Sequence, residues 1–326
     1  MKKAVEMIDS SRISVIIQGP IHPQHTDGTV ANIRSMLPDA EIIVSTWEGS
    51  NYKNRQADIV VESTDPGGGV VFDNPKTYHS SNRQIVSTSR GLQAATREFS
   101  LKIRSDMYFR NLDFLKYWGK YNRRSENYKL LKDRILISTS FTPHPEREPK
   151  PFHPSDWFYF GYTSDLAVVF DSPLCPEPET SRYFENHQRP RVKYDTWIPA
   201  LCRYSSEQYI WIAFIRRFVP LDFEHVFDAR PENLAISEQV FANNTVLLDA
   251  VDMGYESYKY PGLHRDFDLA LMYTHREWQA LYKKYCNAGH ILPLVDREKI
   301  RRAYYSVRAL RRVPWNLKAL LGIRFT

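Results

Sequence analysis

The chain has 326 residues, of which 42% are hydrophobic and 25% are charged. This composition predicts a globular protein with one large domain or two ordinary ones, and it excludes a disordered chain, a collagen and a small disulfide scaffold. No uncharged apolar run approaches the roughly 18 to 20 residues of a membrane-spanning helix, and the first residues lack the apolar core of a secretory signal. We therefore expect a cytoplasmic protein.

The net charge of +6 is concentrated near one end of the sequence. Residues 297–326 hold nine Lys or Arg and one acid, so the other residues together carry a charge of −2. A nearly neutral body does not offer the many phosphate contacts that duplex binding needs, so nucleic acid is not an expected partner. The three cysteines show no Cys-x-x-Cys spacing, so the sequence predicts neither a zinc ribbon nor a disulfide framework.

The first 110 residues predict strands that alternate with helices. An apolar, β-branched run at residues 13–17 predicts a buried strand, and further strands are predicted at residues 41–46, 58–61 and 101–104. Helical patterns lie between them, at residues 29–36 and 82–99. This alternation predicts parallel pairing with right-handed crossovers, and hence a Rossmann-like half with a ligand site at the carboxyl ends of its strands. Gln18, Thr46, Asp65 and Asp106 all fall at or near such ends.

The pattern changes after residue 110. Residues 114–128 and 207–218 favour helices, residues 135–138 favour a strand, and residues 157–161 and 166–170 suggest further strands and core. A proline-rich loop covers residues 143–154. We divide the chain into a nucleotide-sugar-binding half at 1–110, an acceptor-binding half of the same domain at 111–290, and a basic tail at 291–326.

The strongest chemical signal lies where the fourth strand ends, at Arg104-Ser105-Asp106. A carboxylate at this place in an α/β fold is suited to a divalent cation, Mn²⁺ or Mg²⁺, that holds a nucleotide diphosphate. Only one acid is present, however, and Arg104 itself is able to neutralise phosphates directly. An Asp that only caps the following turn explains the same letters.

Three other segments near the predicted strand ends have features of a nucleotide site. Asn82, Arg83 and Gln84 begin a helix, where the dipole favours a phosphate. Gln18-Gly19-Pro20 allows the backbone to approach a ligand closely, although a plain tight turn is an equal alternative. Thr46-Trp47 offers an aromatic face for a base, against simple packing. Neither the Gly-x-Gly-x-x-Gly fingerprint nor a P-loop is present, which disfavours a nicotinamide dinucleotide and a nucleoside-triphosphate motor.

In the second half, two carboxylates are candidates for acceptor chemistry. Asp156 precedes an aromatic run, a combination that holds sugars by stacking and by hydrogen bonds to hydroxyls, although core packing explains the aromatics as well. Glu207 stands in the first turn of a predicted helix, after Ser205 and Ser206. It is a candidate general base, with helix capping as the alternative.

The tail alternates basic and apolar side chains. Its candidate membrane-binding residues are Arg301, Arg302, Arg308, Arg311, Arg312 and Trp315. Such a segment can lie on an anionic leaflet, with about 1 kcal/mol per basic residue near the surface. A helix docked on its own domain with a solvated basic face is the alternative.

Taken together and in order, six segments resemble the WavE lipopolysaccharide-synthesis family. They are residues 13–20, 41–49, 82–91, 101–109, 155–161 and 207–211. The resemblance covers residues 12–250 and implies a bacterial surface-polysaccharide glycosyltransferase with a GT-A-like, Rossmann-type mixed sheet flanked by helices. It places Asp106 at the metal or diphosphate motif of that fold, although the sequence has Arg-Ser-Asp there in place of Asp-x-Asp.

The function expected from residues and resemblance together is transfer of a sugar from a nucleotide-sugar donor, with a UDP-sugar favoured. The acceptor is expected to be a lipid-linked lipopolysaccharide core, O-antigen or capsular glycan, on the inner face of the bacterial inner membrane. The donor-binding residues are then Gln18, Gly19, Pro20, Thr46, Trp47, Asp65, Asn82, Arg83, Gln84 and Arg104, the cation ligand is Asp106, and the catalytic residues are Glu207 and Asp156. A sugar nucleotidyltransferase and a non-catalytic scaffold of a polysaccharide assembly complex are the alternatives.

Overall fold

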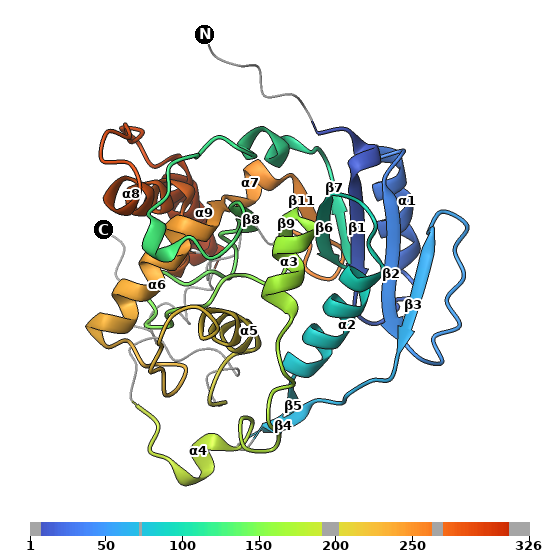
Figure 1. The fold of residues 1–326 in the computed structure, drawn as a ribbon, viewed down its shortest axis with the longest axis horizontal. Helices are drawn as coiled ribbons and strands as arrows, with labels where there is room; N and C mark the ends of the chain where they lie inside the picture. Colours follow the sequence, from blue (N-terminus) through green and yellow to red (C-terminus); the bar gives the residue numbers. More distant parts are fainter. Residues whose placement is uncertain (1–7, 72–73, 191–201, 263–269, 313–326) are drawn as a thin grey trace.

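A computed structural model describes residues 8–71, 74–190, 202–262 and 270–312, with the backbone alone at 74–77 and 305–312. Within these ranges the chain forms a mixed α/β fold around a seven-stranded sheet with the strand order β10, β8, β9, β6, β1, β2, β3 (Figure 1). Strand β9 runs antiparallel to both of its neighbours, and the other strand pairs in the sheet are parallel. This confirms the predicted α/β class with a mixed sheet flanked by helices.

Six strands of the sheet follow predicted strands closely, and β10 was not predicted. Their bounds are Ile13–Gln18 (β1), Glu41–Trp47 (β2), Ile59–Ser63 (β3), Phe99–Arg104 (β6), Ile135–Ser138 (β8), Phe158–Tyr162 (β9) and Thr245–Leu248 (β10). Two smaller antiparallel pairs join Gly69–Val71 (β4) with Asn74–His79 (β5), and Met107–Phe109 (β7) with Tyr255–Ser257 (β11). The central strand β1 is buried along its whole length, whereas the edge strand β3 alternates between exposed and half-buried residues. This contrast is typical of a central strand and an edge strand.

The helices lie on both faces of this sheet. Their bounds are Thr26–Met36 (α1), Ser81–Ala94 (α2), Thr163–Phe170 (α3), Tyr183–Asn186 (α4), Ser206–Ile215 (α5), Pro231–Asn244 (α6), Ala250–Met253 (α7), His275–Tyr285 (α8) and Arg297–Arg312 (α9). Three short 3₁₀ helices occupy Ser10–Arg12, Asp113–Tyr117 and Glu126–Tyr128. Helices α2, α3 and α5 pack on one another on one face, and α6 and α8 pack beside β10 (Figure 1).

Helix α2 approaches the sheet closely at Gly91. A Cβ atom at this position would lie 2.5 Å from Cγ2 of Ile16 and 3.2 Å from Cβ of Ser45. Only glycine allows α2 to lie this close to the sheet, because Cβ atoms in proteins keep a larger distance from neighbouring heavy atoms. The close packing fixes the start of α2, Ser81 to Gln84, relative to the carboxyl ends of β1 and β2.

Two predicted elements are wrong. Residues 166–170, predicted as strand and core, belong to helix α3, in which Leu166, Val169 and Phe170 are buried at helical spacing. A short apolar run fits a buried helix as well as a strand, so the pattern alone could not decide. Residues 114–128, predicted as one helix, form two separate 3₁₀ turns, because Gly119 follows the first with a φ of 68°.

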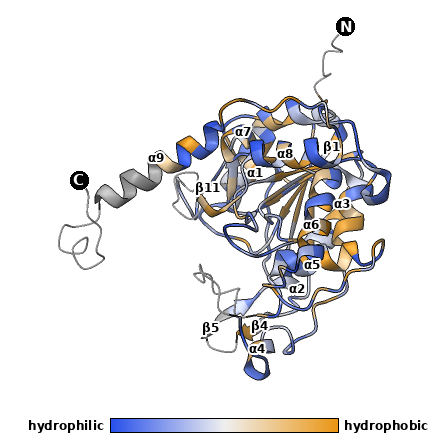
Figure 2. Cartoon of the chain, turned by 90° about the vertical axis from the view of Figure 1, so that its left-hand side faces the viewer, coloured by the Kyte–Doolittle hydropathy of each residue, from blue (hydrophilic) through white to orange (hydrophobic). Residues whose placement is uncertain are grey.

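Helix α9 begins at the edge of the body and runs away from it (Figure 2). Its first turns contact the body through buried side chains, among them Glu298 and Arg302, each 4% exposed. In the part of the chain that the structure describes, no helix combines the length and apolar character needed to cross a bilayer.

Candidate functional site

The carboxyl ends of β1 and β6 meet at one edge of the sheet. Gln18 pairs in register with Arg104 on β6 and with Ser45 on β2. Because β9 is antiparallel to β6, its first residue lies at this same edge, and Asp156 comes just before it in the sequence. The topology therefore brings side chains from distant parts of the sequence to one place.

A cavity of about 530 Å³ opens at this edge, a volume suited to a small-molecule ligand. It is lined by Gln18, Gly19, Pro20, His22, Trp47, Asp65, Ser80, Arg83, Gln84, Ser87, Arg104, Ser105, Asp106, Asp156 and Lys259. Most of the residues that we expect to bind the donor, together with Asp106 and Asp156, thus lie around a single cavity.

A second cavity of about 430 Å³ adjoins the first and shares Ser80, Gln84, Arg104 and Asp156 with it. Its other lining residues are Phe141, Pro143, Glu148, Lys150, His153, Trp157, Glu207, Tyr260 and Met272. Arg104 and Asp156 therefore stand at the boundary between the two cavities, and Glu207 faces the second one.

Arg104 is held between two carboxylates and an indole ring. Its Nε donates to Oδ1 of Asp106 at 3.0 Å, and its Nη2 donates to Oδ2 at 3.1 Å. Its guanidinium carbon lies 4.5 Å from the ring centre of Trp157. Burial lowers the pKa of Arg104, but the charges of Asp156 and Asp106 outweigh this effect and leave the pKa raised. Arg104 is thus a fixed, permanently charged group on the cavity wall.

The surroundings of Asp106 bear on the predicted cation. Asp106 is 1% exposed, both of its carboxylate oxygens accept from Arg104, and Oδ2 also accepts from Oγ of Ser257 at 3.4 Å. A hard cation needs several free oxygen ligands. As they are arranged, the residues do not fit a cation held by Asp106, because a guanidinium already occupies its carboxylate. Binding of a divalent cation at Asp106 therefore stays a prediction.

A second ion pair lies at the wall of the first cavity. Arg83, near the start of α2, donates from Nε and Nη2 to the two oxygens of Asp65 at 2.8 Å each. Both side chains are 38% exposed. The hydrogen bonds from Arg83 lower the pKa of Asp65, and the same contacts raise the pKa of Arg83. The two predicted residues therefore hold each other while remaining open to a ligand.

The turn after β1 is held by hydrogen bonds to its neighbours. Ser87 donates to Oε1 of Gln18 at 2.7 Å, and Ser105 donates to the carbonyl of Pro20 at 2.7 Å. Gly19 has a φ of 115°, which side-chain-bearing residues rarely adopt. The backbone between β1 and the cavity is therefore well defined.

Glu207 has an environment suited to a proton acceptor. It stands in the first turn of α5, which begins with a capping box between Ser205 and Gln208. Burial, followed by the negative charge of Asp156, raises the pKa of Glu207 to about 7. Nε2 of His153 lies 3.7 Å from its carboxylate, and burial lowers the pKa of that histidine to about 3. Glu207 thus changes its protonation state near neutral pH beside a neutral imidazole.

A buried lysine, Lys102, contacts the segment that bears Asp156. It is fully buried on β6, and its ammonium donates to the backbone carbonyl of Asp156. Burial lowers its pKa to about 8, against the opposing effects of Asp156 and Glu207. Lys102 therefore positions the segment that bears Asp156.

Two predicted donor-binding residues lie outside the lining of the first cavity. Thr46 is fully buried in β2, and its hydroxyl has no partner among the described residues. Asn82 uses its amide to hold the loop before α4, because it donates to the carbonyl of Cys175 and accepts from the backbone N–H of Cys175. Gln84, by contrast, lines both cavities, and its buried Oε1 has no partner among the described residues.

Several residues that line the two cavities were not predicted from the sequence, among them His22, His153 and Lys259. His22 follows Gln18-Gly19-Pro20 by two positions, so the predicted turn after the first strand was a usable signal for it. Lys259 has no such signal. It reaches the cavity because β11 pairs with β7, and Tyr258 next to it donates its N–H to the carbonyl of Asp106 at 2.9 Å.

The candidate membrane residues of the tail fall into three groups. Arg301 and Arg302 both donate to Glu298, and Arg302 also donates to the carbonyls of Met272 and Tyr273 at 3.0 Å each. Arg302 is buried, so it holds α9 on the body and is not presented to a surface. Arg308, Arg311 and Arg312 lie on α9, where the structure describes the backbone only. Trp315 lies outside the described residues.

The family model described as WavE lipopolysaccharide synthesis matches residues 13–315, nearly the whole chain. None of the curated proteins matches the sequence.

Proposed function

The chain belongs to the WavE lipopolysaccharide-synthesis family, and from this premise we propose that it is a glycosyltransferase that uses a nucleotide-sugar donor. The observation that supports the proposal most is the pair of adjoining cavities that share Arg104 and Asp156. One has cationic and amide groups suited to a donor, and the other has a half-buried carboxylate, Glu207, suited to an acceptor. A transferase needs such an arrangement, because its two substrates must meet at one boundary.

In the donor cavity, the diphosphate would lie against Arg104, Lys259 and the Arg83–Asp65 pair. Positive charge at this place stabilises the nucleoside diphosphate as it leaves. Trp47 at the end of β2 offers a face for the base, and Gln18 and Gln84 offer amides to ribose or sugar hydroxyls. We propose a UDP-sugar as the donor class.

In the acceptor cavity, Glu207 would act as the general base, with Asp156 binding the acceptor. Glu207 takes the proton of an acceptor hydroxyl, whose oxygen attacks the anomeric carbon of the donor. The bond from that carbon to the diphosphate oxygen breaks, and the nucleoside diphosphate leaves with the electron pair. A base with a pKa of about 7 suits this step at neutral pH. This single displacement inverts the configuration of the anomeric carbon.

We further propose that the fold is GT-A-like and that the acceptor is a lipid-linked glycan at a membrane. A single mixed sheet with the cavities at its carboxyl edge supports the first part. Exposed apolar side chains at the start of the tail support the second: Ile291 is 88% exposed, Leu294 98% and Ile300 60%. Next to basic α9 they would form a peripheral contact with the anionic inner face of the inner membrane.

Thermal shift with UDP, GDP, CMP and dTDP, each with and without Mn²⁺ or Mg²⁺, tests the donor site. We expect one nucleotide to raise the melting temperature of the wild type by mass action. The Arg104→Ala variant should lose the response, and Glu207→Gln, which lies in the other cavity, should keep it. If no nucleotide stabilises the wild type, the result would favour the alternative that the protein is a non-catalytic scaffold. Release of pyrophosphate from a nucleoside triphosphate and a sugar phosphate would favour the nucleotidyltransferase.

A further inference from the structure

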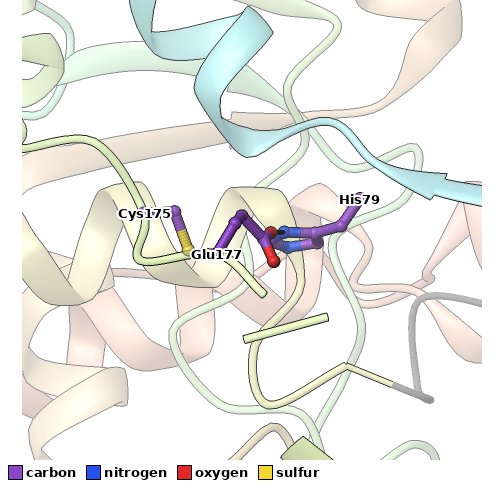
Figure 3. A group of neighbouring side chains, drawn as sticks. All are labelled: His79, Cys175 and Glu177. Carbon is purple, nitrogen blue, oxygen red and sulfur yellow. Dashed lines mark hydrogen bonds and ion pairs between the residues drawn. The ribbon is translucent and has the colours of Figure 1, made fainter. Parts of the chain in front are cut away.

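A cluster of metal-ligand types lies beside the cavities, at the junction of β5 and α2 (Figure 3). His79 is the last residue of β5, and Cys175 and Glu177 belong to the loop between α3 and α4. One ligand atom from each, an imidazole nitrogen, the thiol sulfur and a carboxylate oxygen, all lie within 4.8 Å of one another. His79 is 5% exposed and Cys175 is 3% exposed. Three donors from two distant parts of the sequence thus converge, two of them buried and the third, Glu177, with a side chain that is 20% exposed.

Both ring nitrogens of His79 have a hydrogen-bond partner. Nδ1 lies 2.8 Å from Oε1 of Glu177, and Nε2 lies 2.9 Å from Oγ of Ser81. Burial raises the pKa of Glu177, but the hydrogen bonds from His79 and Ser181 outweigh it and leave the pKa lowered. The carboxylate of Glu177 accepts a hydrogen bond from the N–H at Nδ1 of His79. A proton occupies the space between the imidazole and the carboxylate where a cation would fit.

Glycine is required beside this carboxylate. A Cβ atom at Gly69, the first residue of β4, would lie 2.3 Å from the carboxyl carbon of Glu177. Any side chain at this position would push Glu177 away from His79. The backbone of β4 thus forms one wall of a fitted space around the three donors.

Cysteine, histidine and carboxylate side chains are zinc ligands, and zinc in proteins is commonly four-coordinate. Among the described residues, the group of ligand atoms that converges here consists of His79, Cys175 and Glu177. Three protein ligands leave the fourth position of the ion to a water molecule.

We propose that His79, Cys175 and Glu177 bind a zinc ion. This site is separate from the proposed transfer reaction, and its role is to fasten the start of α2 to the loop before α4. Ser80, which lines both cavities, lies between the ligand His79 and the ring's partner Ser81. Zinc would thereby fix the part of α2 that presents Arg83 and Gln84.

Zinc binding moves one proton within His79 and releases another from Cys175. The ion bonds to Nδ1 of His79, whose proton moves to Nε2, where Oγ of Ser81 is placed to accept it. The thiol of Cys175 loses its proton to solvent and bonds as a thiolate. Oε1 of Glu177 exchanges its hydrogen bond for a bond to the metal. No redox change is needed.

The test measures zinc in the full-length protein, purified without added metal, by elemental analysis after desalting. We expect about one zinc ion per chain in the wild type, and a loss of most of it in His79→Ala and Cys175→Ala. Cys286→Ala is the matched control, because Cys286 lies at the end of α8 with Ala242 and Asn243 as its neighbours. Asp106→Ala should also keep its zinc, which separates this site from any cation in the donor cavity.

A second measurement does not depend on the variants folding. The wild type is stripped with a chelator and titrated with Co²⁺, and the expected result is a thiolate-to-cobalt charge-transfer absorption that saturates at one equivalent and is abolished by Zn²⁺. Absence of zinc in the purified wild type together with absence of this absorption would overturn the proposal. Equal zinc in Cys175→Ala and wild type would overturn it as well.

Discussion

At the residue scale, the carboxylate of Glu207 affects both the proposed reaction and the stability of the fold. Its pKa of about 7 means that the folded protein retains a proton that the unfolded chain releases near pH 4.5. Stability is therefore lost as the pH rises from about 4.5 through 7, because the folded state must then hold a buried charge beside Asp156. A residue placed for proton transfer thus lowers the stability of the fold at neutral pH.

From this we predict opposite effects of Glu207→Gln on activity and stability. Sugar transfer should fall at least about a hundredfold, because the proton acceptor is lost. The wild-type rate should rise with pH up to about 7 and then level off, and the variant should lack this rise. At pH 8 the variant should be more stable by at most about 3 kcal/mol, since the pKa of Glu207 is raised from 4.5 to about 7 and one pKa unit corresponds to about 1.4 kcal/mol.

Activity profiles between pH 5 and 9 and denaturant unfolding at pH 5 and 8 measure both effects. Glu232→Gln is the control, because Glu232 also stands in the first turn of a helix but its side chain is 63% exposed. A variant of Glu207 that keeps wild-type activity and pH dependence would exclude this residue as the base.

A second prediction at this scale concerns Arg104 and Asp106. If Asp106 acts by orienting the guanidinium, Asp106→Asn should weaken nucleotide binding only several-fold, with or without Mn²⁺. Arg104→Lys should weaken it more, by about tenfold or beyond, because lysine keeps the charge but loses the paired hydrogen bonds and the stacking on Trp157. Calorimetric titration with the nucleotide found by thermal shift measures both. Binding that needs Mn²⁺ and disappears in Asp106→Asn would instead support a cation at Asp106.

The sequence could predict single residues only where the local pattern marks a strand end. Gln18, Asp65 and Arg104 follow or end apolar runs, and all three line the donor cavity. Lys259 and His153 lie in loops without such a pattern, and their positions depend on strand pairing far along the chain. Asn82 has the residue type of a ligand contact, but its partner is the backbone of Cys175, which only the tertiary structure brings near.

At the scale of elements, the burial of the strands explains which of them could be predicted. Strands β1, β2 and β6 are buried on both faces. The sequences of β1 and β2 contain continuous apolar runs, whereas β6 places Ser100 and Lys102 in the interior. Helix α3 is short and largely apolar, and this same feature made it resemble a strand. The cavities form between elements, so no single pattern in the sequence contains them.

Helix α2 gives the prediction that belongs to this scale. Gly91→Ala should lower the free energy of unfolding by about 1 to 2 kcal/mol, because the new methyl group meets Ile16 on β1. This loss exceeds the gain of about 0.5 to 1 kcal/mol that alanine brings to a helix interior. Chemical denaturation measures the difference. Ser89→Ala, half-buried on the same helix, is the control and should change stability by less.

The displacement of α2 should also reach the donor site, because Arg83 and Gln84 lie on its first turns. Gly91→Ala is therefore expected to weaken nucleotide binding, whereas Ser89→Ala should not. Unchanged stability and binding in Gly91→Ala would show that the strand yields to the methyl group.

At the scale of the whole molecule, the tail consists of a docked part and a part beyond it. Arg302, Glu298 and Asp249 form a buried cluster that joins α9 to the body, with Arg302 Nη2 3.8 Å from Oδ1 of Asp249. Burial and the charge of Glu298 raise the pKa of Asp249 to about 8. The contribution of this cluster to stability is therefore lost as the pH rises through about 8, when both acids are ionised.

This division predicts different results for two truncations. Removal of residues after 304 keeps Glu298 and Arg302 but deletes five basic residues, each worth about 1 kcal/mol near an anionic surface. We expect it to lower binding to phosphatidylglycerol vesicles by more than about a hundredfold without changing the melting temperature. Removal after residue 294 should reduce binding too, but it should also lower the melting temperature, because Asp249 then loses Arg302.

Vesicle flotation and thermal unfolding of both truncations measure these outcomes, with phosphatidylcholine vesicles as the uncharged control. Leu294→Ser in the full-length chain removes an apolar side chain that is 98% exposed and keeps every charge. Its binding should fall by less than that of the truncation after 304, because charge attracts the tail before apolar groups insert. If the chain that ends at 304 floats as well as the full-length protein, the membrane contact lies elsewhere on the molecule and the basic part of α9 has another partner.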